Sequence, residues 1–195
     1  GSKRTHSLMF EIGAVHVPTM RTFHRFVNPF AGESDVYRAI VDNKKQNVSS
    51  SLSFWHKLLF AGRCRMNMSD MELAEDIDTY MRTHKVPSTV SVLTDFEEWI
   101  KTTCDDLEAT ALVAHNGQSF DFRVMEGNAG SSSFWLGDND MHYVDSYRHI
   151  ARRLYKTERK RFGLGPLFKD LVPATFKHHR ALDDALATAC VMHEM

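Results

Sequence analysis

Two short segments of the chain combine histidine with carboxylates in a way that suits metal-assisted hydrolysis. One of them, HNGQSFD, runs from His115 to Asp121. The other, HHRALDDALAT, runs from His178 to Thr188. Cleavage of a phosphodiester by two metal ions needs several carboxylates around a pair of hard cations, and a base that activates water. The two segments contain both kinds of group, and we expect them to meet at one site.

The carboxylates of Asp121 and Asp184 are the candidate metal ligands. Asp121 lies just past the apolar stretch 109–114 (ATALVA), which predicts a buried strand. Open α/β sheets usually bind ligands at the carboxyl ends of their strands. Asp184 lies at the start of an alanine-rich helical pattern, and histidine is suited to taking a proton from water near neutral pH. Five residues of a helix rotate the chain by about 140°, so a histidine five residues before Asp184 must lie in the turn before the helix.

Each candidate residue also has an ordinary structural role open to it. Asp121 on its own fits a helix cap, and His178 and His179 on their own fit an exposed basic turn. Asp183 fits a solvated position in the first helical turn, where the helix dipole favours negative charge. Phe120 fits either packing in the core or stacking against a base. Only the combination of the two segments favours the catalytic interpretation.

Strands and helices alternate around these segments and predict an α/β domain. The apolar run 8–17 and the alternating run 22–27 predict a β-hairpin, whereas the polar stretch 35–53 predicts an exposed excursion. Capping boxes at Ser69–Glu72 and Thr94–Glu97 predict two helix starts. The sequence further predicts helices over 54–60, 122–126 and 146–154, the last of them capped by Asp145. Two more helices are predicted, one from Gly165-Pro166 and one from Leu182 to the end. We also expect a loop over 128–140 and core positions for Phe54, Trp55 and Trp99.

Composition excludes several classes of protein. With 43% hydrophobic and 25% charged residues, the 195-residue chain suits one globular domain. A net charge of −1 provides no global basic field, so a polyanionic partner must be held by a local patch or through bound cations. The basic run from Arg152 to Arg161 is a candidate patch, with a solvated face as its alternative. Three scattered cysteines, no apolar run of transmembrane length and no signal peptide favour an intracellular protein, cytoplasmic or nuclear.

The two segments resemble the second and third motifs of the DEDDh exonucleases, the 3′-to-5′ exonucleases related to proofreading subunits, the TREX enzymes and oligoribonuclease. The resemblance rests on Asn116-x3-Phe120-Asp121 and His179-x4-Asp184, in the family's order and at a similar separation. Supporting similarity, also in the family's order, extends over the segments 11–15, 23–29, 144–152 and 162–167.

The resemblance implies a ribonuclease H-like, three-layer α/β fold with a mixed central sheet flanked by helices. It implies a single exonuclease-like domain over 3–195 that lacks its first strand. Asp121 and Asp184 would bind Mg²⁺ or Mn²⁺, two ions in an intact site. His179, which the register of the motif favours over His178, would be the general base. The residues that would contact the terminal nucleotide are His115, Asn116 and Phe120.

One motif of the family is not present ahead of the predicted strand 11–15. The family's Asp-x-Glu would lie there, but Gly1 to Phe10 contain no carboxylate, and Glu11 fits a structural role better than that of a replacement ligand. Either the motif lies upstream of Gly1 or the protein has lost it, and without it we expect very low metal affinity and turnover. The expected function of an intact site is 3′-to-5′ hydrolysis at a single-stranded or frayed end of DNA or RNA. The alternative is a catalytically inactive exonuclease-like domain that binds nucleic acid or protein.

Overall fold

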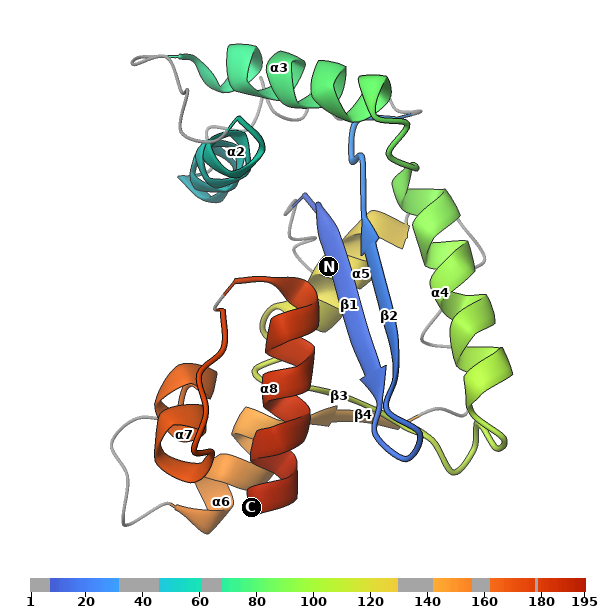
Figure 1. Ribbon diagram of the computed structural model, residues 1–195, viewed down its shortest axis with the longest axis vertical. Helices are drawn as coiled ribbons and strands as arrows, with labels where there is room; N and C mark the ends of the chain where they lie inside the picture. Colours follow the sequence, from blue (N-terminus) through green and yellow to red (C-terminus); the bar gives the residue numbers. More distant parts are fainter. Residues whose placement is uncertain (1–7, 32–45, 61–67, 130–141, 156–161, 178) are drawn as a thin grey trace, which may run out of the picture.

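A β-hairpin lies in the middle of the molecule, with helices on both sides of it (Figure 1). The computed structural model describes residues 8–31, 46–60, 68–129, 142–155, 162–177 and 179–195. The hairpin pairs β1 (Glu11–His16) with β2 (Arg21–Phe26) in antiparallel register, and Glu11 lies opposite Phe26. The hairpin predicted over 8–27 is thereby confirmed.

Two further strands form a parallel pair. β3 (Ala111–Ala114) pairs with β4 (His142–Asp145), and Ala114 lies opposite Asp145 at the carboxyl ends of the strands. The loop that follows β3 therefore begins beside the last residue of β4. Strands of both orientations are present, as predicted, and in the described part of the chain they form two two-stranded sheets. The strand β4 itself was not predicted.

Helices cover both faces of the hairpin. They are α2 (Gln46–Leu59), α3 (Asp70–Thr83), α4 (Thr89–Thr103), α5 (Asp121–Ala129), the π-helix η1 (Ser146–Ala151), α6 (Arg152–Leu154), α7 (Leu164–Leu171) and α8 (Ala181–Glu194). Successive residues of a strand face opposite sides. Ile12 and Phe23 face a core that includes Phe96 of α4 and residues of α5, whereas Glu11 and Gly13 face α8. The hairpin thus separates α4 and α5 from α8.

Gly13 allows α8 to lie directly on the hairpin. A Cβ atom at this position would lie 2.3 Å from the backbone nitrogen of Leu182 and 2.4 Å from the carbonyl carbon of Ala181. Both are backbone atoms and cannot move aside as the end of a flexible side chain can. The first turn of α8, which contains Asp184, is therefore packed against the peptide backbone of β1.

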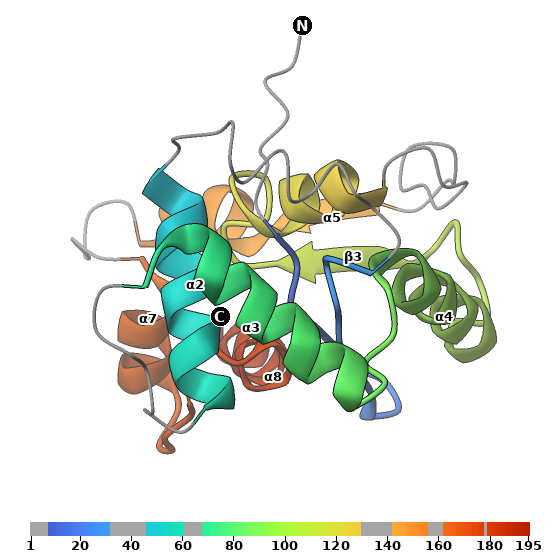
Figure 2. The same ribbon diagram turned by 90° about the horizontal axis from the view of Figure 1, so that it is seen from above.

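Two smaller cores complete the packing. In one, Phe10 and Phe30 pack with Leu52 of α2 and Ile77 of α3. Figure 2 shows α3 crossing α2. In the other, buried residues of η1, α7 and α8 pack together, including Ala151, Leu167, Phe168, Ala187 and Val191.

One of the two predicted capping boxes is confirmed and the other is wrong. Ser69 accepts from the backbone nitrogen of Glu72, and the Glu72 carboxylate accepts from the backbone nitrogen of Ser69. Thr94, by contrast, lies inside α4, where its hydroxyl donates to the carbonyl of Val90. The helix begins six residues earlier than expected, because its cap is Ser88 instead of Thr94; Ser88 accepts from the backbone nitrogen of Ser91.

The helix α2 corrects two expectations. Residues 46–53, expected in an exposed excursion, form its first half; residues 32–45 lie outside the described residues. Leu52 and Trp55 are three residues apart on the buried side of the helix. Phe54 and Leu58, four residues apart, lie on the other side, and Phe54 is 42% exposed rather than in the core.

The remaining helix starts agree with the sequence to within two residues. α7 begins at Leu164, and Pro166 lies in its first turn, where a missing N–H costs no helical hydrogen bond.

Trp99, expected in the core, is half-buried. Three other predicted features lie outside the described residues: the basic run 156–161, most of the loop 128–140, and His178. Among the helices that the structure describes, none is long and apolar enough to cross a membrane.

Candidate active site

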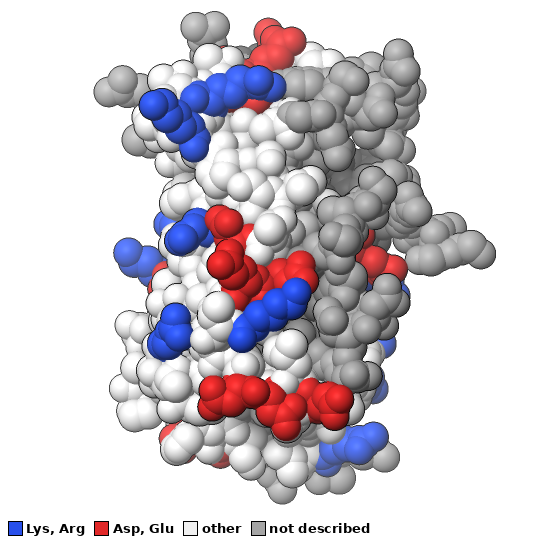
Figure 3. All heavy atoms as spheres, turned by 90° about the vertical axis from the view of Figure 1, so that its right-hand side faces the viewer, with Lys and Arg blue, Asp and Glu red and all other residues white. Residues whose placement is uncertain are grey.

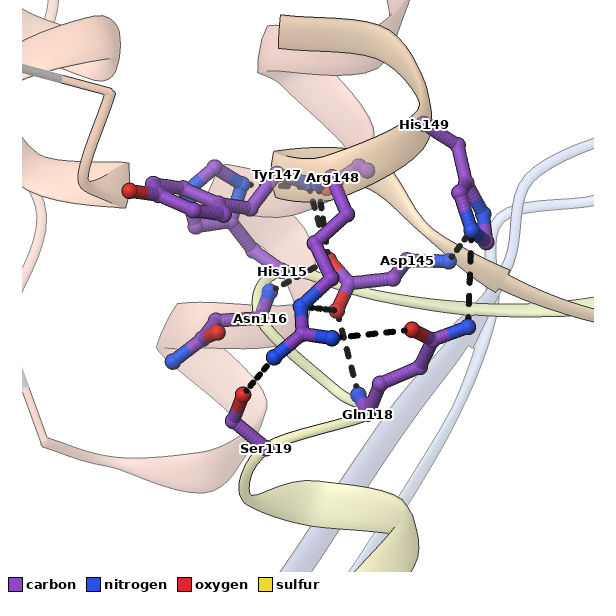
Figure 4. Close-up of polar contacts among 9 residues, drawn as sticks. His115, Asn116, Gln118, Ser119, Asp145, Tyr147, Arg148 and His149 are labelled. Carbon is purple, nitrogen blue, oxygen red and sulfur yellow. Dashed lines mark hydrogen bonds and ion pairs between the residues drawn. The ribbon is translucent and has the colours of Figure 1, made fainter. Parts of the chain in front are cut away.

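The loop after β3 is fixed by one buried carboxylate, that of Asp145 at the end of β4 (Figure 4). The Asp145 side chain is 0% exposed. It accepts from the backbone nitrogens of Asn116 (3.0 Å) and Gln118 (3.1 Å) in the loop. It also accepts from the backbone nitrogens of Tyr147 (3.0 Å) and Arg148 (3.2 Å), and so caps η1 as predicted. One carboxylate therefore joins the carboxyl ends of both parallel strands.

Side chains of η1 add a second set of contacts to the same loop. Arg148 donates to the hydroxyl of Ser119 (2.7 Å) and to the amide oxygen of Gln118 (3.4 Å). The amide nitrogen of Gln118 lies 3.4 Å from Nε2 of His149. Figure 4 shows these side chains converging on the loop from the helix. The segment that precedes Asp121 is thus held at several points.

Both ring nitrogens of His115 already have protein partners. Nε2 donates to the carbonyl oxygen of Phe162 (2.7 Å), and Nδ1 lies 3.0 Å from the hydroxyl of Ser146. Burial lowers the pKa of His115, so the neutral ring accepts the Ser146 hydroxyl proton at Nδ1. This arrangement favours a role in holding the loop over the direct nucleotide contact expected from the sequence.

Asn116 and Phe120 are the exposed members of the loop. Asn116 adopts a left-handed backbone conformation with φ 66°, which asparagine tolerates better than most residues. The side chain of Phe120 is 60% exposed, so core packing, one of its two predicted roles, is wrong. Both side chains are accessible to a ligand at the amino end of α5.

The two predicted metal ligands approach each other from the amino ends of two helices. Asp121 is the first residue of α5, and Asp184 lies in the first turn of α8. Burial, together with the smaller effect of the negative charges of Asp184 and Asp145, raises the pKa of Asp121 from 3.8 to about 6. Two carboxylate groups that repel each other suit a divalent cation, because the cation removes the repulsion. Within the described residues, however, no group of three or more His, Cys, Asp and Glu side chains is placed to hold a metal ion.

The raised pKa predicts how stability changes with pH in the metal-free protein. Between pH 3.8 and about pH 6 the unfolded chain loses the Asp121 proton while the folded chain keeps it. The free energy of unfolding should therefore fall as pH rises through this window and level off above it. Thermal unfolding in EDTA from pH 4 to 7 measures this effect as the difference between the wild type and Asp121→Asn, which lacks the titration. Mn²⁺ should raise the melting temperature of the wild type at pH 7. An identical pH dependence in both proteins would contradict the prediction.

His179 lies in the turn before α8, where the sequence predicted it. Its backbone is left-handed with φ 64°. Its ring centroid lies 6.5 Å from that of Phe54 on α2, in an edge-on arrangement. The next residue, Arg180, accepts the backbone N–H of Asp184 at its carbonyl oxygen (2.8 Å), so the turn leads directly into the helix that contains Asp184.

An ion-pair network that the sequence did not predict anchors this turn to the hairpin. The carboxylate of Glu11, with a side chain 4% exposed, accepts from Nη2 of Arg180 (3.2 Å) and from Nε2 of His24 (2.7 Å). The Arg180 guanidinium also lies 5.7 Å from the ring centre of Phe26. Glu11, His24 and Phe26 lie on the side of the hairpin that faces α8. The structural role expected for Glu11 is therefore specific: it holds the residue next to His179.

Replacing Glu11 with glutamine is expected to lower the free energy of unfolding by about 1–3 kcal/mol. The variant leaves the Arg180 guanidinium without its anionic partner, and the partial exposure of Arg180 keeps the effect below that of a fully buried pair. Urea denaturation measures the change, and Glu98→Gln, at an exposed position on α4, is the matched control. A double-mutant cycle with Arg180→Gln should give a coupling energy above about 0.5 kcal/mol. Additive effects of the two substitutions would show that the pair does not contribute.

Comparison with known proteins places these residues in a family. Residues 77–192 match the RNase T family of exonucleases, a match that covers more than half of the chain and includes Asp121, His179 and Asp184. The chain therefore belongs to the RNase T exonuclease family, within the DEDDh-type superfamily, and its α/β architecture is that of a ribonuclease H-like exonuclease. No curated protein matches the chain. Membership of this family indicates nuclease activity on nucleic acids, and the family generally uses divalent metal ions.

Proposed function

We propose that the protein is a 3′-to-5′ exonuclease that hydrolyses phosphodiester bonds of DNA or RNA by a two-metal mechanism. The observation that carries the proposal is the approach of Asp121 and Asp184, which is close enough for the charge of one to raise the pKa of the other. Their helices begin at the loop after β3 and at the turn of His179, so the predicted acids and base belong to neighbouring elements. The expected substrate is a single-stranded or frayed 3′ end.

Each residue of the proposed site has a separate task. Asp121 and Asp184 would hold Mg²⁺ or Mn²⁺, which when bound supplies Lewis-acid activation of the attacking water and the phosphate. His179 takes the proton of that water, from a turn that leaves its ring outside the helix. The two exposed residues of the loop, Asn116 and Phe120, orient the terminal nucleotide. His115, together with Asp145, keeps the loop in place.

The number of carboxylates supports a second candidate function. Among the described residues, no group of three or more His, Cys, Asp and Glu side chains is placed to hold a metal ion. Two ligands alone bind Mg²⁺ or Mn²⁺ weakly, because hard cations need more oxygen ligands than two side chains supply. The second candidate is an inactive exonuclease-like domain that binds nucleic acid or protein.

Release of nucleotides from a labelled 3′ end separates the two functions. The chain, and a version extended at its N-terminus, are incubated with a 3′-labelled single-stranded oligonucleotide in Mn²⁺, with EDTA as the control. An exonuclease of the proposed polarity releases the label first as a mononucleotide and is blocked by a modified 3′ end, but not by a modified 5′ end. Absence of hydrolysis in both proteins, with retained binding of the oligonucleotide, would favour the inactive domain.

The proposal also covers the extent of the domain and the cellular location of the protein. We propose that residues 3–195 act as one exonuclease domain, since the hairpin and the parallel strands contribute to the same site. An intracellular setting is supported by Cys104 and Cys190, neither of which is in a disulfide.

A further inference from the structure

The backbone of His179 adopts a left-handed conformation for which the neighbouring sequence gives no reason. Its φ is 64°, and in this conformation the Cβ atom crowds the carbonyl oxygen that follows it. Two other left-handed residues have local causes, since Met20 lies in the turn of the hairpin and Lys85 follows the end of α3. His179 instead precedes a helix, so a contact from elsewhere in the fold must hold it in this conformation.

The start of α8 also has no local feature that fixes the path of the chain. Arg180 is the N-cap residue, and its side chain makes no capping hydrogen bond. Helices usually begin at Ser, Thr, Asp or Asn, whose side chains accept from backbone nitrogens of the first turn. Ser69 and Ser88 do this for α3 and α4. The entry into α8 therefore depends on tertiary contacts.

The ion pair between Arg180 and Glu11 supplies the missing constraint. Two nitrogens of the guanidinium contact the same carboxylate oxygen, Nε at 3.3 Å and Nη2 at 3.2 Å. His24 fixes that carboxylate within the hairpin, because its Nε2 lies 2.7 Å from the same oxygen. On the main chain, the carbonyl oxygen of Arg180 accepts the N–H of Asp184. Arg180 thus joins β1 to the first turn of α8, with His179 directly before it.

Burial distinguishes this ion pair from an ion pair on the surface. The side chain of Glu11 is 4% exposed and that of Arg180 is 32% exposed. In the pair between Glu97 and Lys101 on α4, the exposed fractions are 28% and 53%. Figure 3 shows the side of the molecule where α4 lies, on which acidic side chains form exposed groups. Exposed pairs contribute little, whereas a buried carboxylate that loses its partner is costly, so the first pair is the one able to oppose backbone strain.

We propose that Glu11 and Arg180 are positioning residues for the general base, because their ion pair holds His179 in its left-handed conformation. This inference rests on the proposed exonuclease function and adds to it two residues that act on the reaction through His179. Without the pair, the turn relaxes to an ordinary backbone conformation. The direction of the Cα–Cβ bond then changes, and the imidazole moves away from the water whose proton it takes.

Kinetics of the version extended at its N-terminus test whether the pair acts through the base. Arg180→Gln and Glu11→Gln should each lower kcat for Mn²⁺-dependent hydrolysis by about 10- to 100-fold and change KM by less than about twofold. In a His179→Ala background the same substitutions should lower kcat by less than about twofold, because the base that they position is already absent. Arg180→Lys, which keeps the charge, should recover part of the loss. A guanidinium that bound a phosphate would instead raise KM when it is replaced.

A stability comparison tests the backbone strain without any measurement of activity. Glycine adopts the left-handed conformation without steric cost, so His179→Gly should unfold at a higher urea concentration than His179→Ala. In an Arg180→Gln background the turn is free to relax, and this difference between the urea midpoints should disappear or change sign. Lys101→Gln removes the cation of the exposed pair on α4 and should preserve both the difference and the wild-type kcat.

The outcomes separate failure of this inference from failure of the proposed function. Losses that multiply when Arg180→Gln and His179→Ala are combined overturn the positioning role and leave the exonuclease intact. A glycine–alanine difference that Arg180→Gln does not change does the same. A wild type that does not hydrolyse the strand overturns the proposed function and the catalytic role of the pair with it, and the urea midpoints then still decide whether the pair holds the turn. Melting temperatures verify that each variant is folded.

Discussion

In the version extended at its N-terminus, Asp184→Asn is expected to reduce Mn²⁺-dependent hydrolysis at the 3′ end by on the order of 10²- to 10⁴-fold. The substitution replaces a charged oxygen ligand by a neutral amide of the same shape, so the loss reflects the cation and not the packing of α8. The pKa of Asp121 should also move back toward 3.8, because the charge of Asp184 contributes to its elevation. Initial rates with a 3′-labelled oligonucleotide at saturating substrate, as a function of Mn²⁺ concentration, measure the effect.

The neighbouring residue provides a matched control. Asp183 lies in the same first turn of α8 and has the same charge, but it is one position out of the motif that begins at His179. Asp183→Asn should retain activity within about threefold of the wild type, since a partly exposed charge near a helix end contributes little. A reversed result, with Asp183 essential and Asp184 dispensable, would assign the site to the other register, that of His178 and Asp183.

Asp145→Ala is expected to lower the free energy of unfolding by about 3–5 kcal/mol. The substitution removes a fully buried carboxylate that accepts four backbone N–H groups, two in the loop after β3 and two in η1. Loss of a helix cap alone costs about 1 kcal/mol, and each buried donor left unpaired adds about 1–3 kcal/mol. Urea denaturation, with Asp105→Ala at an exposed position as the control, measures the difference.

The size of the loss distinguishes two roles for Asp145. A change of only about 1 kcal/mol would mean that the carboxylate acts as a helix cap and that the loop is held by other contacts. A large change, with the amide protons of Asn116 and Gln118 exchanging faster than in the wild type, would confirm that the loop depends on Asp145.

Local patterns in the sequence predicted the elements that are built from neighbouring residues. The hairpin follows from alternation and the start of α3 from the capping box at Ser69, both of which involve contacts only a few residues apart. The start of α4 was predicted wrongly because a second capping pattern at Thr94 lies inside the helix, whereas the true cap at Ser88 forms a simpler contact. The strand β4 has four residues, too few for alternation to be distinguished from chance.

The contacts that position the site are long-range, and no local pattern contains them. Asp145 was predicted as a helix cap, which is half of its role; its bonds to the loop after β3 join residues that are 27 and 29 positions apart. Glu11 and Arg180 are separated by 169 positions. The exposure of Phe54 was readable in principle, because it lies out of phase with Leu52 and Trp55 on the helix.

Gly13 of β1 affects how the spacing of the Asp121 and Asp184 carboxylates responds to substitutions elsewhere in the chain. Since Gly13 presents only hydrogen atoms to α8, the helix rests on a peptide unit, whose dimensions do not vary with the amino acid. A side chain in its place would act as a spacer of variable length. Main-chain geometry thus sets the distance of Asp184 from the hairpin. Substitutions elsewhere in the core can therefore change the free energy of unfolding without changing the spacing of the carboxylates that would hold a cation.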